Sequence, residues 1–286
     1  MQHLTIGLIQ QRWHPDPDEH RARLSEDAGA AANQGAQLIC LQELTLSPYF
    51  ATRPGLDAGP YAETIPAGPT CRFARALAQE TGAFITASLF EATGPGYNTA
   101  ICYAPTGDLA GLTRKQHIPG GPGYHEDEHF HPGDSDYPVH TIAGIPAALP
   151  TCYDQWFPEL ARIYGLQGAQ LIIYPTAIGS EPTAPDFDSQ PLWQKVIVAN
   201  GIMNNCFMVA INRVGTEDGV TFYGSSFVSD PLGNVLAQAP RHDPAVLVAR
   251  LDFGLRQRWG ELFPFFRQRR PETYGRLVQR LPDQPG

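Results

Sequence analysis

The chain has 286 residues, enough for one large hydrophobic core or two modest domains. Its 42% apolar and 17% charged residues are typical of a globular protein, and no apolar run is long enough to span a membrane. The formal net charge of -9 argues against a nucleic-acid-binding surface, favours cationic ligands and suits the cytoplasm. The first residues lack the basic region and cleavage site of a signal peptide.

Strands and helices alternate along the first half of the chain. The predicted elements are a strand at 4–10, a helix at 18–37, a strand at 38–43, a helix at 70–83 and strands at 84–91 and 97–105. The second helix is predicted to be capped by Thr70 and stopped by Gly82. The last two strands flank a Gly/Pro turn, which predicts an antiparallel pair.

A polar stretch rich in glycine and histidine, 113–136, separates the two halves. After it we predict a short strand at 146–151, a helix at 158–169, a strand at 171–177, a helix at 191–205 and strands at 207–214, 224–230 and 245–252. The alternation runs on without a linker. It predicts one α/β domain over residues 1–286, with a mixed sheet or two sheets that carry helices on their outer faces. The basic, aromatic tail from 253 to 286 is predicted to be an arm that packs on a neighbouring subunit.

The five cysteines are widely spaced and form no CxxC pair, which fits reduced thiols better than disulfides. Cys152 differs from the others because it ends an apolar run and is followed at once by "YDQWFPE". A helix is predicted to open at Pro158, and a helix N-terminus or a nearby cation favours a thiolate. The alternative is an inert core thiol. Pro150, two residues earlier, is a poor guest in a central strand.

Two charged residues stand where predicted strands end. Glu43 closes "LICLQE", and a carboxylate at the mouth of a buried strand must be solvated, paired or used. It is either a capping or ion-pairing residue or a catalytic one. Arg114 and Lys115 follow a strand in the same way, and the alternative for them is a solvated basic pair.

The segment "HEDEH", 125–129, matches the H-E-x-x-H pattern of zinc hydrolases. Glycine and proline on both sides leave no room for the helix that would bring the two histidines to one metal. We therefore interpret it as a charged loop over a cleft.

Three long segments resemble the carbon–nitrogen hydrolase, or nitrilase, superfamily. They are "LQELTLSPYF" (41–50), "YNTAICYAPTGDLAGLTRKQHIPGGPGYHEDEHFHPGD" (97–134) and "CYDQWFPELARIYGLQGAQLIIYPTAIGSEP" (152–182). The resemblance covers nearly the whole chain and is closest to the N-carbamoylputrescine amidohydrolase branch. It implies a four-layer αββα sandwich with two mixed sheets. It also implies no metal or organic cofactor, and a homodimer or larger assembly formed through the face behind the cysteine strand and helix.

The resemblance also implies a catalytic triad of Glu43, Lys115 and Cys152, with Glu126 as a second glutamate in the covering loop. An amide or ureido carbon is a poor electrophile and needs an activated nucleophile together with charge stabilisation. We hypothesise that Glu43 takes the Cys152 proton, and that Lys115 and the Tyr153 backbone N–H stabilise the oxyanion. Glu43 then serves as acid and again as base.

The expected substrate is a small N-carbamoyl amine, whose distal ammonium should meet a pocket acid. Glu181 and Asp154 are the candidates, with a helix-cap acid and a solvated loop charge as the alternatives; Trp156 and Tyr49 either line the pocket or only pack. Departures from the branch at Ala148, Pro150, Gly120 and in the loop after Phe50 are expected in or near the cleft. Other open hypotheses are an aliphatic amidase, an N-carbamoyl amino acid hydrolase with a basic pocket, and a non-catalytic protein that kept the fold.

Overall fold

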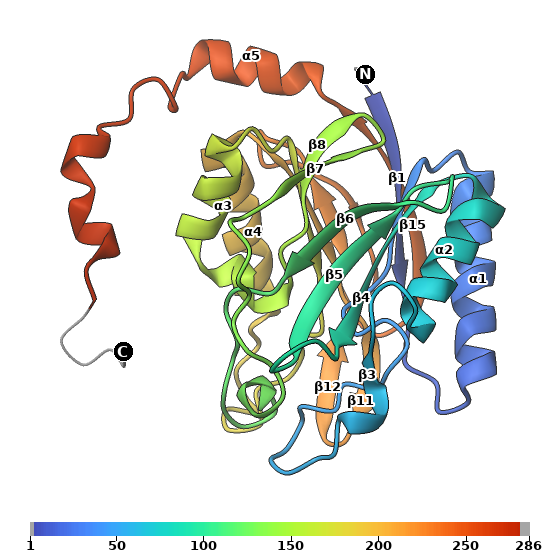
Figure 1. Cartoon of the computed structure of the whole chain (residues 1–286). Helices are drawn as coiled ribbons and strands as arrows, with labels where there is room; N and C mark the ends of the chain where they lie inside the picture. Colours follow the sequence, from blue (N-terminus) through green and yellow to red (C-terminus); the bar gives the residue numbers. More distant parts are fainter. Residues whose placement is uncertain (1–2, 281–286) are drawn as a thin grey trace.

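Two mixed β-sheets lie face to face, and a pair of helices covers the outer face of each (Figure 1). The computed structural model describes residues 3–280. The first sheet has the strand order β15-β1-β2-β4-β5-β6, with β3 paired to β4. Its strands are β1 (His3–Gln10), β2 (Leu38–Cys40), β3 (Ala62–Glu63), β4 (Phe84–Glu91), β5 (Tyr97–Tyr103), β6 (Leu109–Arg114) and β15 (Ala245–Asp252).

The second sheet has the order β14-β13-β10-β9-β8-β7, and a separate hairpin, β11–β12, stands beside the sandwich. These strands are β7 (Val139–Ile142), β8 (Ile145–Ala148), β9 (Leu171–Pro175), β10 (Phe207–Ile211), β11 (Val214–Glu217), β12 (Val220–Tyr223), β13 (Phe227–Ser229) and β14 (Val235–Gln238). The five helices of the described residues are α1 (Pro17–Asn33), α2 (Pro69–Thr81), α3 (Pro158–Leu166), α4 (Gln190–Asn204) and α5 (Gly254–Leu262).

Side-chain alternation along the strands builds the layers. In β1, Leu4, Ile6 and Leu8 point into the core between the sheets, whereas Ile9 packs in the cluster beneath α1 and α2. Strand β9 alternates in the same way, with Ile173 between the sheets and Ile172 toward α3 and α4. Each such fully buried aliphatic side chain contributes about 1.5–3 kcal/mol. The predicted four-layer αββα sandwich is confirmed.

One predicted helix cap is wrong. Helix α2 begins at Pro69 with Gly68 as its N-cap, so Thr70 lies inside the first turn. The Thr70 backbone N–H donates to Glu63 Oε2 at 2.8 Å and its hydroxyl donates to Glu63 Oε1. The carboxylate from β3 thus satisfies one of the free N–H groups of the first turn, where the sequence predicted a threonine cap. The predicted stop at Gly82 is correct, because this residue has φ of 67° and closes the helix.

Two strands end earlier than the sequence predicts. Strand β2 ends at Cys40, which leaves Glu43 in the segment beyond it, and β8 ends at Ala148. Pro150 therefore lies outside the ladder and costs the sheet no hydrogen bond. The apolar runs extend past both strands because the turns that follow are also buried.

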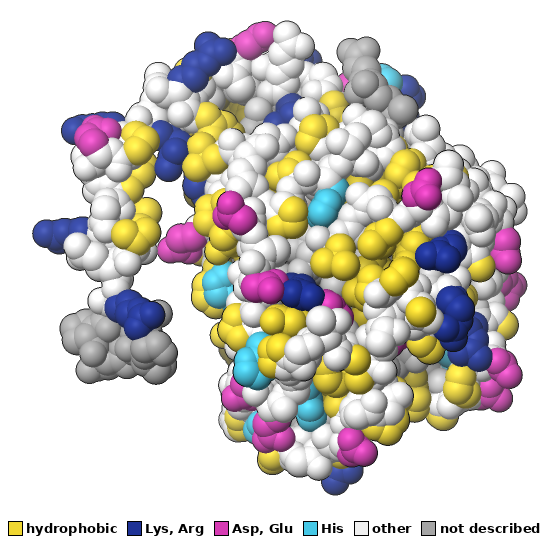
Figure 2. All heavy atoms as spheres, in the orientation of Figure 1, with side chains coloured by type: hydrophobic (Ala, Val, Ile, Leu, Met, Phe, Trp, Pro, Cys, Tyr) yellow, Lys and Arg dark blue, Asp and Glu magenta, His cyan; other side chains and the backbone are white. Residues whose placement is uncertain are grey.

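The chain leaves the sandwich after β15. Phe253 still packs on Phe207 in the core between the sheets, with ring centroids 5.0 Å apart. Helix α5 still contacts the body, because Arg256 donates to the Asn205 carbonyl and Trp259 to the Ile202 carbonyl. The last turns of the arm, residues 271–278, stand apart from the body (Figure 1). The space-filling view shows hydrophobic side chains along this arm (Figure 2), and Leu277 and Val278 are 66% and 87% exposed. Residues 281–286 of the predicted arm lie outside the described residues.

Within residues 3–280, no helix combines the length and the apolar character needed to cross a membrane.

Candidate active site

The ends of three strands meet at one end of the sandwich. Strands β2 and β6 both run parallel to β4, since β6 is separated from it by the antiparallel β5. Glu43 and Lys115 therefore leave the first sheet in the same direction. Cys152 follows β8 in the second sheet, and Glu126 comes from a loop that folds over the gap. The structure thus brings all four predicted catalytic residues together.

Lys115 lies between two carboxylates. Its Nζ donates to Glu43 Oε1 at 2.9 Å and to Glu126 Oε2 at 2.5 Å. All three side chains are buried, with at most 1% exposed. Burial alone would lower the pKa of Lys115, but the charges of Glu126 and Glu43 outweigh it and hold this pKa above its ordinary value. The ammonium group therefore stays charged.

Glu43 keeps one oxygen free. Its Oε1 accepts hydrogen bonds from Lys115 and, at 2.7 Å, from Asn98 Nδ2. Its Oε2 is buried and has no partner among residues 3–280. A buried carboxylate oxygen without a donor is costly, and it is ready to accept a proton.

Glu126 is the first residue of a short 3-10 turn, Glu126–Glu128. Its Oε1 accepts a hydrogen bond from the Tyr49 hydroxyl at 2.8 Å. Burial raises the pKa of Glu126, the charge of Lys115 lowers it, and the nearby Glu43 raises it again; the result is above the ordinary value. Tyr49 therefore stands behind Glu126 and holds it against Lys115.

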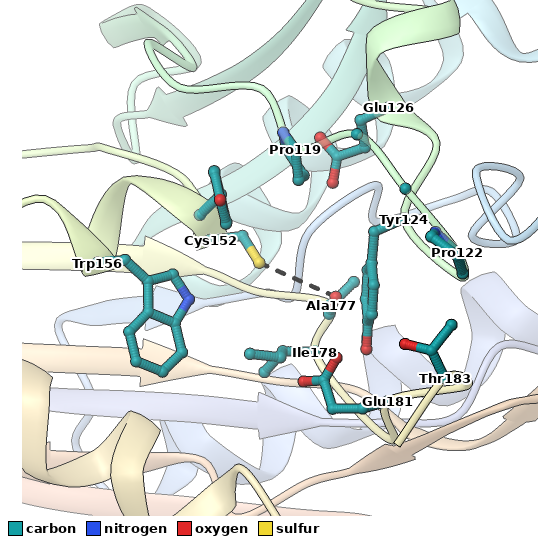
Figure 3. Close-up of a pocket in the computed structure, with 13 residues that line it drawn as sticks. Pro119, Pro122, Tyr124, Glu126, Cys152, Trp156, Ala177, Ile178, Glu181 and Thr183 are labelled. Carbon is teal, nitrogen blue, oxygen red and sulfur yellow. Dashed lines mark hydrogen bonds between the residues drawn. The ribbon is translucent and has the colours of Figure 1, made fainter. Parts of the chain in front are cut away.

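Cys152 opens a 3-10 turn, Cys152–Trp156, with φ of 37°. A residue with a side chain rarely adopts this conformation, which costs about 1–3 kcal/mol and persists only where the surroundings enforce it. Its Sγ lies 3.9 Å from the carbonyl oxygen of Ala177 (Figure 3). Burial raises the pKa of the thiol well above its ordinary value, and so does Glu43, against the lowering effect of Lys115. The resting group is a neutral thiol, so its activation requires a base.

The turn leaves the backbone N–H of one pocket residue without a partner inside the turn. Its first hydrogen bond runs from the Asp154 N–H to the Thr151 carbonyl at 3.0 Å, so the Tyr153 N–H has no partner within the turn. Tyr153 also lines the pocket. This N–H lies next in sequence to the thiol that would attack a substrate carbon.

Asp154 does not face the pocket. Its carboxylate is fully buried and accepts from the Thr151 N–H at 3.1 Å, from the His117 N–H at 2.9 Å and from His117 Nδ1 at 2.8 Å. The His117 ring in turn stacks on Phe157, with centroids 3.6 Å apart. Asp154 ties the cysteine turn to the loop after Lys115, so the structure does not support its predicted contact with substrate.

A cavity of about 410 Å³ opens above the cysteine. Its described lining residues are Pro119, Gly120, Gly121, Pro122, Tyr124, Glu126, Cys152, Tyr153, Trp156, Ala177, Ile178, Glu181 and Thr183. Figure 3 shows Glu181 across the cavity from Glu126, beside Tyr124 and Ile178, with Trp156 on the side of Cys152. Of the residues proposed to bind substrate, Trp156 and Glu181 line the pocket, whereas Tyr49 is not among the described lining residues. Among the departures from the branch, Gly120 lines the pocket but Ala148 and Pro150 do not.

The "HEDEH" segment forms only the short 3-10 turn, Glu126–Glu128, and does not extend into an α-helix. Glu126 is buried against Lys115, and the two flanking histidines are not grouped with it as ligands. Over residues 3–280, no group of three His, Cys, Asp or Glu side chains is arranged to hold a metal ion.

Asn98 and Arg213 were not among the site residues predicted from the sequence. Asn98 interrupts the apolar strand β5, and its side chain binds Glu43 while its carbonyl accepts from the Lys115 N–H at 2.8 Å. Arg213 follows the apolar run of β10 and donates to the Glu43 carbonyl at 2.7 Å. The signal for both was a polar residue within or directly after a buried strand, which requires a partner.

Comparison with known proteins identifies the family. The carbon–nitrogen hydrolase family model matches residues 5–261. N-carbamoylputrescine amidase from Arabidopsis thaliana is 40% identical over 90% of this chain and 88% of the relative. Citrullinase from Francisella tularensis is 35% identical over 98% of this chain and 100% of the relative. The crystal structure of a carbon–nitrogen hydrolase from Helicobacter pylori G27 superposes with a TM-score of 0.85 at 31% identity, over 97% and 99% of the two chains. The chain therefore belongs to the carbon–nitrogen hydrolase family and is an amidohydrolase of the nitrilase superfamily.

Proposed function

We propose that this enzyme hydrolyses an N-carbamoyl amine to the amine, CO2 and ammonia, and that Cys152 is its nucleophile. The names of two relatives, an N-carbamoylputrescine amidase and a citrullinase, support a substrate with a ureido group. The free Oε2 of Glu43 takes the thiol proton, because Oε1 is already engaged by Lys115 and Asn98. The thiolate then attacks the ureido carbon.

The oxyanion that forms is stabilised by Lys115 and by the Tyr153 N–H, which has no partner within its turn. Glu43 returns its proton to the first departing nitrogen and next activates a water molecule, which hydrolyses the carbonyl–sulfur bond and frees Cys152. The carbamic acid that is released breaks down to CO2 and the second nitrogen product, so that one amine and one ammonia leave. Glu126 keeps Lys115 in place throughout. No charge enters or leaves the buried cluster during the cycle, because the proton only moves between Cys152, Glu43 and substrate.

The substrate class is supported mainly by Glu181, an acid without a partner among the described residues, across the pocket from Glu126 (Figure 3). No hydrogen bond or ion pair within residues 3–280 engages the Glu181 carboxylate, and no Lys, Arg or His is among the described lining residues. A distal ammonium would satisfy Glu181. Citrulline also carries an ammonium, but the carboxylate beside it would find no cation in the pocket and would be repelled by Glu181. We therefore favour a carbamoylated diamine over a carbamoylated amino acid.

Ammonia release distinguishes these substrates. We expect N-carbamoylputrescine to exceed citrulline and simple amides in kcat/KM, with Cys152→Ala as the blank. Glu181→Gln should raise KM for N-carbamoylputrescine about tenfold, the cost of losing one charge-assisted hydrogen bond. Butylurea, which lacks the ammonium, is the matched control and should be insensitive to this change. Release from citrulline but not from N-carbamoylputrescine would overturn the substrate class and leave the family assignment intact.

We also propose that the arm, residues 253–286, packs on a second copy of the chain. Leu262, Leu277 and Val278 are 71%, 66% and 87% exposed. The arm contacts its own body through Arg256, Trp259 and Phe266, and its last turns stand apart from it (Figure 1). Such apolar exposure is expected of an interface rather than of free surface. Light scattering should give the mass of a dimer or larger assembly, and Leu277→Glu with Val278→Glu should reduce it. A monomeric wild-type chain would refute this proposal.

A further inference from the structure

Arg213 reaches from one sheet to the catalytic segment of the other. It lies two residues after β10 in the second sheet, and its side chain is fully buried. Its Nη2 lies near three carbonyl oxygens: Glu43 at 2.7 Å, Leu44 at 3.2 Å and Ser47 at 3.4 Å. A buried guanidinium is costly unless its charge is paired. It therefore needs an acid close by.

Glu217 is that acid. Arg213 Nη1 donates to Glu217 Oε1 at 2.7 Å, and Glu217 Oε2 accepts from the Tyr49 backbone N–H at 2.7 Å. The pair thus binds residues 43–49, here called the base segment, at both ends. Arg213 binds the carbonyl groups of its first two residues and of Ser47, and Glu217 binds the backbone N–H of its last residue, Tyr49.

The base segment contains a strained residue that explains the need for such a clamp. Leu44 has φ of 48°, a conformation that branched side chains rarely adopt. The carbonyls on which Arg213 acts are those of this residue and of Glu43 before it. A second support, from the Thr45 N–H to the Ser88 carbonyl at 2.8 Å, does not involve the pair. Without the pair the segment would stay attached but lose its fixed geometry.

Both carboxylates that flank Lys115 depend on this segment. Glu43 is its first residue, and Tyr49, its last, donates from its hydroxyl to Glu126 at 2.8 Å. From these contacts we infer that Arg213 and Glu217 are positioning residues, which set Glu43 and Glu126 against Lys115 without contacting substrate. This inference rests on the catalytic roles proposed for Glu43 and Lys115.

Glu217 is the better residue to change, because its side chain is 10% exposed at the wall of a second, open cavity of about 540 Å³. Glu217→Ala removes both contacts. Glu217→Gln keeps the volume and one acceptor for the Tyr49 N–H, but turns an amide N–H toward Arg213. Asp230→Asn is the matched control, since Asp230 is equally a buried carboxylate that accepts hydrogen bonds, yet only within the turn between β13 and β14.

Three measurements on these variants test the inference: kcat and KM for ammonia release, the rate of Cys152 alkylation by iodoacetamide, and urea unfolding. A displacement of about 1 Å at the base can cost up to about a hundredfold in rate. We expect kcat to fall by about 10- to 100-fold in Glu217→Ala and about tenfold in Glu217→Gln, with KM within about twofold. Asp230→Asn should lower only the urea midpoint.

A purely structural role would lower the urea midpoint in all three variants and leave kcat of the folded enzyme unchanged, and that result would overturn the inference. If Glu217→Ala does not fold, Glu217→Gln decides. The alkylation rate tests separately whether Glu43 is the base and whether Glu217 positions it. Glu43→Gln is the reference variant. Slow alkylation in Glu43→Gln but wild-type rates in both Glu217 variants would overturn the positioning role alone. A wild-type rate in Glu43→Gln would remove the proposed base, and the inference with it.

Discussion

Two neighbouring cations, Arg114 and Lys115, each hold a pair of carboxylates, yet the two clusters differ in almost every other respect. Lys115 binds Glu43 and Glu126, and none of the three side chains is more than 1% exposed. Arg114 binds Glu91 and Asp134; the arginine side chain is 19% exposed and that of Asp134 is 62% exposed. Glu126 of the Lys115 cluster lines the pocket, and no residue of the Arg114 cluster is among the described lining residues.

The difference lies in the oxygens that remain free. Arg114 donates to both Glu91 oxygens, at 2.6 and 2.9 Å, and Thr99 adds a third donor at 2.7 Å. In the Lys115 cluster, Glu43 Oε2 has no donor among the described residues. Saturated carboxylates fix structure, whereas a buried carboxylate with an open oxygen can take up a proton. The same pattern of charges can therefore serve stability or chemistry, and hydrogen-bond saturation distinguishes the two.

The largest expected effect is the loss of Lys115. Lys115→Met should lower kcat by about a hundredfold or more, because the proposed oxyanion donor is lost. It should also lower the free energy of unfolding by about 3–5 kcal/mol, since Glu43 and Glu126 are left buried without a cation. Ammonia release and urea unfolding measure the two effects. A folded Lys115→Met enzyme with a near-normal kcat would contradict the assignment of this cluster to catalysis.

Arg114→Gln is the matched change one residue earlier. It should lower the free energy of unfolding by about 1.5–3 kcal/mol through loss of charge-assisted hydrogen bonds, and leave kcat within roughly threefold of wild type. The same two assays measure it. If kcat falls as far as in Lys115→Met, the two clusters are not functionally separate and the comparison fails.

The sequence could not distinguish these two residues. "TRK" reads as one basic pair at a strand end, and both side chains have the same solvated alternative. Successive residues of a strand point to opposite faces, so only the register of β6 decides which cation is buried. The layers were more predictable, because Leu4, Ile6 and Leu8 alternate with Ile9 in a pattern that requires two buried faces.

The position of Asp154 could not be predicted from the sequence either. By sequence it is an acid two residues after the candidate nucleophile, and thus a candidate for substrate binding. Its partners are backbone N–H groups of Thr151 and of His117, which lies 37 residues earlier. No pattern in the sequence reports such a contact. Glu181, predicted on equal grounds, lines the pocket because the segment after β9 passes along its wall.

The smallest expected effect concerns pH, where the two clusters should respond with opposite sign. Burial would raise the pKa of Glu91, but its hydrogen bonds from Arg114 and Thr99 hold it below the ordinary value of 4.5. A group whose pKa is lower in the folded state stabilises the protein at pH values above its unfolded-state pKa. That stabilisation is lost as the pH falls through the folded-state pKa. The pKa of Glu126 is instead raised, so its contribution is complete below about 4.5 and declines as pH rises through the folded value.

Urea unfolding of Glu91→Gln and Glu126→Gln between pH 3 and pH 8 compares these slopes. The stability difference between wild type and Glu91→Gln should shrink on acidification below about pH 4.5, because protonated Glu91 resembles glutamine. As pH rises from about 4.5 toward neutrality, the wild type should lose stability relative to Glu126→Gln. Parallel curves for the two variants would mean that both glutamates titrate alike. In that case the pH response would not distinguish the proposed catalytic cluster from the structural one.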